Sequence, residues 1–371
     1  MTEKPYDLYS LTPFERWVVD EGLQVHTTLM LSDIYAIETH PWEKSGCSAL
    51  LLDLTPAPLE GTLINVPGTS RYVVDIPPGG KFNAEHHMYE EIFYVLKGRG
   101  ATSVWVEGGP KHTFEWKEGS VFSIPLNTTH EIYNGQGDTE ARLYAATNAP
   151  TAFNMYASPD FIFNCPMQFP ERFNPTDEQY FSGKANKLED RYTETNFISD
   201  VNQVALDRWT ARGPGANMMY LMAGGHFMCH VSEFPGGMYK KAHTQEFTPQ
   251  RAGLVSSVAY LFLSGEGYDL QWAPGSNPTK GGPFERIDYG KGALVTPGIG
   301  YHQHFNPSPE PMRYVVLRFG NPRYQGSANA RFRETGGTNM EFGDEPSAIR
   351  ELFETEVAAR NATSDMAQYA G

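Results

Sequence analysis

The sequence lacks the features that membrane proteins and nucleic-acid-binding proteins share. Lys and Arg number 29 against 44 Asp and Glu, and no basic cluster offsets the net charge of −15. Nucleic acids and anionic membrane surfaces repel such a chain, so we expect neither as a partner. No apolar run is long enough to span a bilayer. Residues 1–5 lack the pattern of a secretion signal, and we therefore expect a cytoplasmic protein.

Cysteine is also scarce. Cys47, Cys165 and Cys229 are far apart, odd in number and without CXXC spacing. This pattern argues against a disulfide framework and predicts reduced thiols in a protein core.

Glycine, proline and aromatic residues are frequent by contrast. The chain has 36 Gly and 27 Pro, aromatic residues make up 13% of it, and charged residues only 20%. This combination is typical of many short strands joined by tight turns, and it predicts an all-β fold. At 371 residues the chain is too long for one ordinary domain and long enough for two well-filled cores.

Two blocks combine histidine and carboxylate residues with spaced glycines. The first block contains, in order, Gly79, Glu85, His86, His87, Glu91 and Gly98. The second contains Gly119, Pro125, Asn127, His130 and Asn134. Such residues are candidate metal ligands if the fold brings the two blocks together.

The first block favours a strand, because a β-branched and aromatic run, residues 92–96, follows it. Alternate residues of a strand face the same side. Glu85, His87 and Glu91 are separated by even numbers, so an unbroken strand would turn them to one face and His86 to the other.

The second block supplies a third ligand from a separate strand. Residues 121–124 form a strand-like run, and His130 opens the strand after it. A barrel could hold His87, Glu91 and His130 around one ion. Imidazole and carboxylate donors suit Fe(II), Mn(II), Zn, Ni or Cu, and two His with one carboxylate is the open arrangement of non-haem iron oxygenases. We expect Fe(II).

The two blocks resemble the signature of the cupin β-barrel, G(X)5HXH(X)3-4E(X)6G followed by G(X)5PXG(X)2H(X)3N. The resemblance implies a double-stranded β-helix, or jelly-roll, in which His87, Glu91 and His130 bind a divalent metal. Glu85 stands where the signature has its first His. Glu85 is either a fourth ligand or a catalytic acid or base beside an open coordination position. His86 replaces it only if a bulge disturbs the strand.

The second half of the chain repeats the first. The strand-and-turn phrase before Gly79 recurs before Gly237, and residues 260–267 echo residues 93–100. The second block is echoed by Gly292, Pro297, His302 and Asn306. Two tandem copies of one barrel are the economical interpretation. The chain thus resembles the bicupins over roughly residues 47–165 and 216–322.

The second copy keeps histidines but loses other ligand types. Gln245 replaces the second His of the triplet, and Val258 occupies the carboxylate position. A three-imidazole site of His243, His302 and His304 is one alternative, since His302 and His304 share a strand face. We favour a structural or dimer-forming second barrel over this second metal site.

The repeats divide the chain into five expected segments. They are an N-terminal arm (1–46), a metal-binding barrel (47–165), an interdomain connection (166–215), a degenerate barrel (216–322) and a C-terminal tail with a helix (323–371). Thr12-Pro13 favours a short capped helix in the arm. Ile349, Leu352, Phe353 and Val357 recur at helical spacing in the tail.

Strand alternation also predicts the wall of the first barrel's pocket. Phe93 and Val95 share the face of Glu91, Phe122 and Ile124 share a face of their own strand, and Trp105 is near in sequence. Such a lining suits a small aromatic or hydrophobic substrate.

An open metal can polarise a bound oxygen or activate dioxygen beside a chelating substrate. The chain resembles gentisate and quercetin dioxygenases and manganese oxalate decarboxylases, and its one complete barrel looks most gentisate-dioxygenase-like. That resemblance implies a dioxygenase acting with O2 on a small phenolic or otherwise metal-chelating substrate, and a homo-oligomer. The alternatives are a metal-dependent isomerase, lyase or decarboxylase with Glu85 as acid or base, and a non-catalytic binding or storage barrel.

Overall fold

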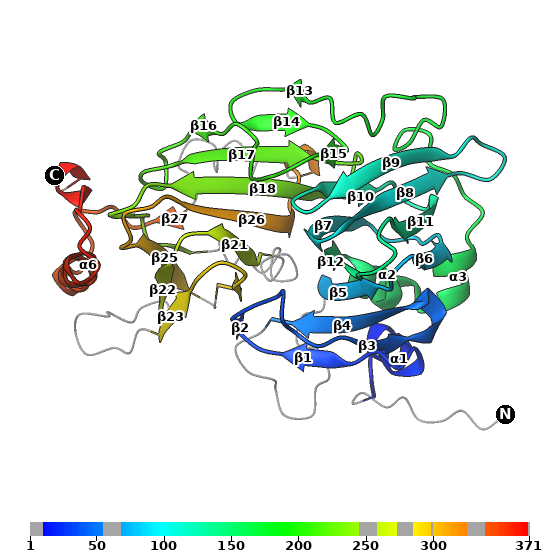
Figure 1. Ribbon diagram of the computed structural model, residues 1–371, viewed down its shortest axis with the longest axis horizontal. Coiled ribbons are helices and arrows are strands. Elements are labelled where there is room, and N and C mark those ends of the chain that lie inside the picture. The colour runs from blue at the N-terminus through cyan, green and yellow to red at the C-terminus, as the bar shows by residue number, and fades with distance from the viewer. Residues whose placement is uncertain are drawn as a thin grey trace.

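The protein consists of two β-barrels side by side, with few helices (Figure 1). The structure, a computed structural model, describes residues 10–54, 68–244, 258–272, 285–297, 300–324 and 338–369. The expected all-β fold with two tandem barrels is confirmed. Among the described residues no helix combines the length and apolarity needed to cross a membrane.

The first barrel has two facing sheets that enclose its interior. One sheet runs in the order β1-β4-β5-β12-β7-β10-β15, with β3 beside β4, and the other in the order β6-β11-β8-β9. Their strands are β1 (Val25–Thr27), β3 (His40–Trp42), β4 (Cys47–Asp53), β5 (Ser70–Ile76), β6 (Lys81–Glu85), β7 (Glu91–Lys97), β8 (Arg99–Trp105), β9 (His112–Lys117), β10 (Val121–Ile124), β11 (Thr129–Asn134), β12 (Ala141–Thr147) and β15 (Phe197–Ile198).

The second barrel has the same plan. Its sheets run β13-β14-β17-β18-β26-β21-β24-β2, with β16 beside β17, and β23-β22-β25-β20-β27, with β19 beside β25. The strands are β2 (Met30–Leu31), β13 (Asn186–Lys187), β14 (Tyr192–Glu194), β16 (Asp207–Arg208), β17 (Ala216–Leu221), β18 (Phe227–Phe234), β19 (Met238–Tyr239), β20 (His243–Thr244), β21 (Tyr260–Ser264), β22 (Gly267–Trp272), β23 (Glu285–Tyr289), β24 (Leu294–Val295), β25 (Tyr301–Asn306), β26 (Met312–Phe319) and β27 (Thr338–Asn339).

The two barrels exchange edge strands. β2, from the N-terminal arm, pairs with β24 of the second barrel, and β15, from the interdomain connection, pairs with β10 of the first. The turn glycines Gly119 and Gly292 adopt positive φ angles of 86° and 90°. A Cβ there would approach Asp200 Oδ1 to 2.5 Å and Asp33 Oδ1 to 2.8 Å, respectively, so both turns require glycine. The N-terminal arm and the interdomain connection therefore make equivalent contacts, the arm with the second barrel and the connection with the first.

A shared apolar core joins the barrels, and β7 shows how. Phe93 and Val95 belong to the core inside the first barrel, whereas Ile92, Tyr94 and Leu96 belong to a core that includes residues of both barrels. Both faces of β7 are therefore buried, which explains why its sequence is a continuous apolar run after Glu91.

Helices cover the outer ends of the barrels. They are α1 (Pro13–Asp20), α2 (Ala149–Tyr156), α3 (Pro159–Asn164) and α6 (Ser347–Ala359), with short 3-10 turns η1 (Glu43–Ser45), η3 (Pro322–Tyr324) and η4 (Met366–Tyr369). Thr12 and Glu15 form the capping box that starts α1. The buried face of α6, namely Ile349, Phe353 and Val357, packs on the outer side of the second barrel. The helix expected near each terminus is therefore confirmed.

The three cysteines are free and buried, as the sequence predicted. Burial raises the pKa of the Cys47 thiol to about 12, so this thiol stays protonated and unreactive near neutral pH.

Candidate metal centres in the two barrels

Four predicted ligands meet inside the first barrel. The side-chain donor atoms of Glu85, His87, Glu91 and His130 all lie within 4.8 Å of one another. His87 Nε2 is 3.4 Å from Glu91 Oε2, and His130 Nε2 is 4.0 Å from the same oxygen. Residues from three strands and one loop thus point their donors at one place.

The local structure that carries these donors differs from the sequence prediction in one respect. The sequence suggested a single unbroken strand, but β6 ends at Glu85 and β7 begins at Glu91, with His87 in the loop between them. The strand expectation was wrong for residues 86–90, because the chain crosses there from one sheet to the other. Glu85 lies opposite His130 in the β6–β11 pair, beside a register shift.

The turn that leads to His130 has a left-handed residue. Asn127, where the signature has glycine, adopts φ 55°, a conformation that asparagine tolerates better than most residues. Its side-chain amide donates to the carbonyls of Cys165 and Met167 at 2.9 and 2.7 Å. These bonds fix the turn and hence the start of β11.

Each imidazole is oriented by a contact between its Nδ1 and a backbone carbonyl. His87 Nδ1 lies 2.9 Å from the Tyr89 carbonyl, and His130 Nδ1 lies 3.4 Å from the Thr128 carbonyl. The Tyr89 ring also stacks on the His87 ring at a centroid distance of 3.6 Å. A carbonyl beside Nδ1 favours a proton there, which leaves Nε2 as a lone-pair donor.

The donor atoms that face the centre have no hydrogen-bond partner among the residues that the structure describes. His87 Nε2, His130 Nε2 and Glu91 Oε2 are buried and make no hydrogen bond. Burial lowers the pKa of His87 and of His130 to about 4, so both rings are neutral, as metal ligands must be. Burial also raises the pKa of Glu91 and of Glu85 to about 7. Buried, unsatisfied donors are costly, and a divalent cation is the ligand that fits them.

Tyr72 on β5 supports the site, although no sequence motif pointed to it. Its hydroxyl donates to Glu91 Oε1 at 2.7 Å and so leaves Oε2 to face the centre. Tyr72 packs edge-on against Phe93, with ring centroids 6.3 Å apart. The motif spacing could not reveal it, because β5 lies outside both blocks.

Removing this hydroxyl is expected to weaken metal binding. Tyr72→Phe keeps the ring but frees Glu91 Oε1, so we expect metal affinity to fall about 10- to 100-fold. Competition with a chelator measures the change. Tyr133→Phe is the matched control, because Tyr133 bonds Glu131 on the outer side of β11 and its loss should leave affinity unchanged. Equal affinities for the Tyr72→Phe variant and the wild type would contradict this role.

The expected pocket residues divide into two groups. Phe93, Val95, Phe122 and Ile124 lie in the interior core, where Phe93 and Phe122 stack with centroids 5.2 Å apart and Ile124 pairs with Glu91. Trp105 lies elsewhere: it pairs with Thr129, next to the His130–Val104 pair, and so faces outward. With His86 and Asn127 it lines a surface pocket of about 350 Å³. Side chains alternate between the two faces of a strand, so Trp105 faces outward because its neighbour Val104 faces the barrel interior.

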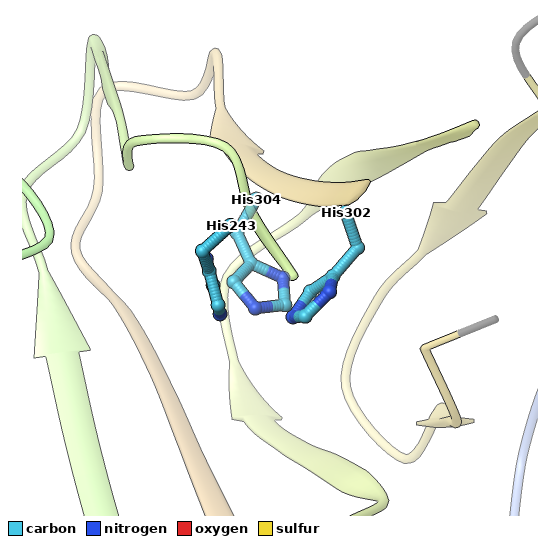
Figure 2. A group of neighbouring side chains, drawn as sticks. All are labelled: His243, His302 and His304. Atoms are coloured by element: carbon cyan, nitrogen blue, oxygen red, sulfur yellow. The ribbon is translucent and has the colours of Figure 1, made fainter. Parts of the chain in front are cut away.

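The second barrel also assembles its three histidines. Donor atoms of His243, His302 and His304 lie within 4.8 Å of one another, and Figure 2 shows the imidazoles turned toward a common centre. His243 pairs with His302, as Glu85 pairs with His130, so these two are structural counterparts of the first site. Gln245, expected in the remaining position, lies outside the described residues.

Part of the first barrel matches a known family model. Residues 72–147 match a family model described as a cupin domain. Solved structures with a similar arrangement include a tryptophan-to-tyrosine variant of oxalate decarboxylase from Bacillus subtilis, at 12% identity and a TM-score of 0.47, covering 80% of this chain and 78% of that one. A structure of the substrate binding mode of oxalate decarboxylase matches at 11% identity and a TM-score of 0.48, with the same coverages. The cupin-domain match therefore covers part of the first barrel, and the second barrel repeats the strand plan of the first.

Proposed function

We propose that this two-barrel protein is a metal-dependent enzyme whose first barrel carries out a non-redox proton-transfer reaction on a small metal-chelating organic substrate. Isomerases, lyases and decarboxylases belong to this class. The observation that carries the proposal is the position of Glu85 among the metal donors. Glu85 is a carboxylate within 4.8 Å of the donor atoms of His87, Glu91 and His130, and alone of the four it is partly exposed.

The donor set fits a hard divalent ion. Two neutral imidazoles and up to two carboxylates match Mn(II) or Fe(II) better than thiolate-seeking metals, and the carboxylate charges offset that of the cation. Such an ion supplies Lewis acidity, which polarises a substrate oxygen. His87, His130 and Glu91 would hold it.

The remaining residues would position the substrate and move a proton. Phe93, Phe122 and Ile124 form an apolar wall behind the donors, which excludes water from that side. Glu85, at the exposed edge, would take a proton from the substrate at a carboxylate oxygen and return it to the product. The chemistry therefore needs no oxidant.

A dioxygenase is the second candidate, and one feature favours it. If Glu85 stays off the metal, His87, His130 and Glu91 form the two-His, one-carboxylate set that leaves positions open for substrate and O2. A non-catalytic barrel would bind metal without turning over any substrate.

Turnover without oxygen distinguishes these functions. Protein loaded with Mn(II) or Fe(II) is screened against phenolic, β-dicarbonyl and hydroxy-acid compounds, under air and under strict anaerobiosis. We expect product to form at the same rate in both, with no oxygen uptake at an electrode. Turnover that stops without O2 and consumes it stoichiometrically would contradict the proposal and support the dioxygenase.

A further inference from the structure

The histidine cluster of the second barrel departs from the ligand positions of the first. His302 corresponds to His130, because each is paired with the residue that ends or forms the preceding short strand. His304 stands two residues later on β25, where β11 has Ile132. Val258, which by its spacing takes the position of the first site's carboxylate ligand, is buried and apolar. The second cluster has therefore exchanged a carboxylate for a third imidazole, at a position outside the cupin signature.

One nitrogen of each imidazole is engaged with the protein. Asp269 Oδ1 lies 2.6 Å from His304 Nδ1, and a backbone carbonyl lies 3.1 Å from His243 Nδ1. The hydroxyl of Tyr260 lies 3.2 Å from His302 Nε2 and can accept its proton. These contacts orient each ring and favour a proton on the engaged nitrogen, which leaves the lone pair on the other.

The opposite nitrogens are unsatisfied. His243 Nε2, His302 Nδ1 and His304 Nε2 are buried and make no hydrogen bond within the part of the chain that the structure describes. The three residues are at most 1% exposed, and their rings turn toward one centre (Figure 2). Burial lowers the pKa of His243 and of His302 well below the usual value, so these rings are neutral. Three lone pairs cannot bond one another, and a water has only two protons to give, whereas one metal ion satisfies all three.

The space beside the cluster limits what else can bind. His243 and His304 line a cavity of about 20 Å³. This volume holds one or two water molecules and excludes an organic ligand. A metal on the three histidines would therefore complete its coordination with water, out of reach of any substrate. Such a closed site is typical of a structural metal.

The charges around the cavity favour one class of metal. Four basic side chains line it: Arg191, Arg212, Lys240 and Arg318. Positive charge nearby makes any cation harder to bind, and the Asp269 carboxylate beside His304 offsets only part of this cost. Ions that bind imidazole strongly, such as Zn(II), Co(II), Ni(II) or Cu(II), meet the cost better than Mn(II), which prefers oxygen donors.

We propose that His243, His302 and His304 hold a structural transition metal, Zn(II) or a similar ion, and that the two barrels of this protein select different metals. The first barrel, with its carboxylate donors, suits Mn(II) or Fe(II). The second metal ties the two-residue strand β20 to β25, its neighbour in the sheet. This site does not depend on the function proposed for the first barrel, because the two clusters share no residue.

Metal stoichiometry tests the proposal. Full-length protein is stripped with a chelator, dialysed against Mn(II) or Zn(II), and analysed for its metal content. We expect the wild type to bind about one equivalent of Mn(II) and about two of Zn(II). His304→Gln should lose one equivalent of Zn(II) and keep its Mn(II), whereas His130→Gln should keep one equivalent of Zn(II) and bind no Mn(II). The second-barrel metal is the Zn(II) lost in His304→Gln, so the result stands whether or not the first barrel binds metal.

A further histidine of the same cavity gives the matched control. His230 lines the cavity, but its Nε2 bonds Ser232 at 2.9 Å and it lies outside the donor cluster. His230→Gln should therefore keep the Zn(II) that His304→Gln loses. Asp269→Asn is the second test if His304→Gln fails to fold in a thermal melt. It removes the charge beside His304 Nδ1, and we expect Zn(II) affinity at this site to fall about 10- to 100-fold.

A stabilisation measurement tests the structural role. Zn(II) should raise the melting temperature of His130→Gln, because the metal binds the folded second barrel, and it should leave that of the His130→Gln, His304→Gln double variant unchanged. In the His130→Gln background Mn(II) should bind at least about 100-fold more weakly than Zn(II). Equal Zn(II) content in the wild type and His304→Gln, or equal affinities of the second site for Mn(II) and Zn(II), would overturn the proposal.

Discussion

Replacing His130 with glutamine is expected to empty the first barrel of metal and to abolish turnover. His130 is fully buried, and in the described part of the chain its Nε2 has no hydrogen-bond partner. A glutamine would leave one imidazole and the carboxylates, and the loss should exceed the roughly 10- to 100-fold effect of removing an outer partner such as Tyr72. Elemental analysis after gel filtration, together with the turnover rate, measures both effects.

Two histidine variants control this result. His86→Gln changes the neighbouring imidazole, which lies beside Asn127 and outside the donor cluster, so metal content should be unchanged. His302→Gln alters the structural counterpart in the second barrel and should leave first-barrel turnover unchanged. A His130→Gln variant that retains a full equivalent of metal in the first barrel would contradict the assigned ligand set.

Replacing Glu85 with glutamine is expected to preserve metal binding and remove turnover. Glutamine keeps the shape and one oxygen donor of the side chain but cannot accept the substrate proton. General acid–base catalysis contributes about 10²- to 10⁴-fold, so kcat should fall by that range. Because the other three donors remain, metal content should stay close to that of the wild type.

A second carboxylate near the first barrel provides the control. Glu21 lies close enough to influence the pKa of Glu85, but it bonds Trp42 and Lys44 and is outside the donor cluster. Glu21→Gln should therefore keep its kcat. If Glu85→Gln loses its metal and recovers full activity in excess metal, then Glu85 is a ligand without a role in proton transfer.

Much of the fold could be predicted because apolar patterning and turn residues are local signals. The run at residues 92–96 lies within β7, and His130 lies in β11, as strand patterning predicted. The repeat of turns predicted the second barrel. The exchange of β2 and β15 was missed, although the related sequences at residues 31–34 and 198–201 carry a signal for it.

The surroundings of the sites were harder to predict because they depend on distant contacts. Tyr72 reaches Glu91 across sheet neighbours, and Asp269 reaches His304 from an adjacent strand. Arg191 and Arg212 lie in the interdomain connection, where no strand pattern indicated that they line the second barrel. Motif spacing locates the candidate metal ligands, whereas the residues that orient and surround those ligands come from separate segments.

The central claim is that the first barrel holds a divalent metal between His87, His130 and Glu91. Anomalous X-ray diffraction from crystals grown with Mn(II) tests it most directly. We predict one strong peak about 2.0 to 2.3 Å from His87 Nε2, His130 Nε2 and Glu91 Oε2. A first barrel with no anomalous peak, or with a peak bound only by other residues, would contradict the account.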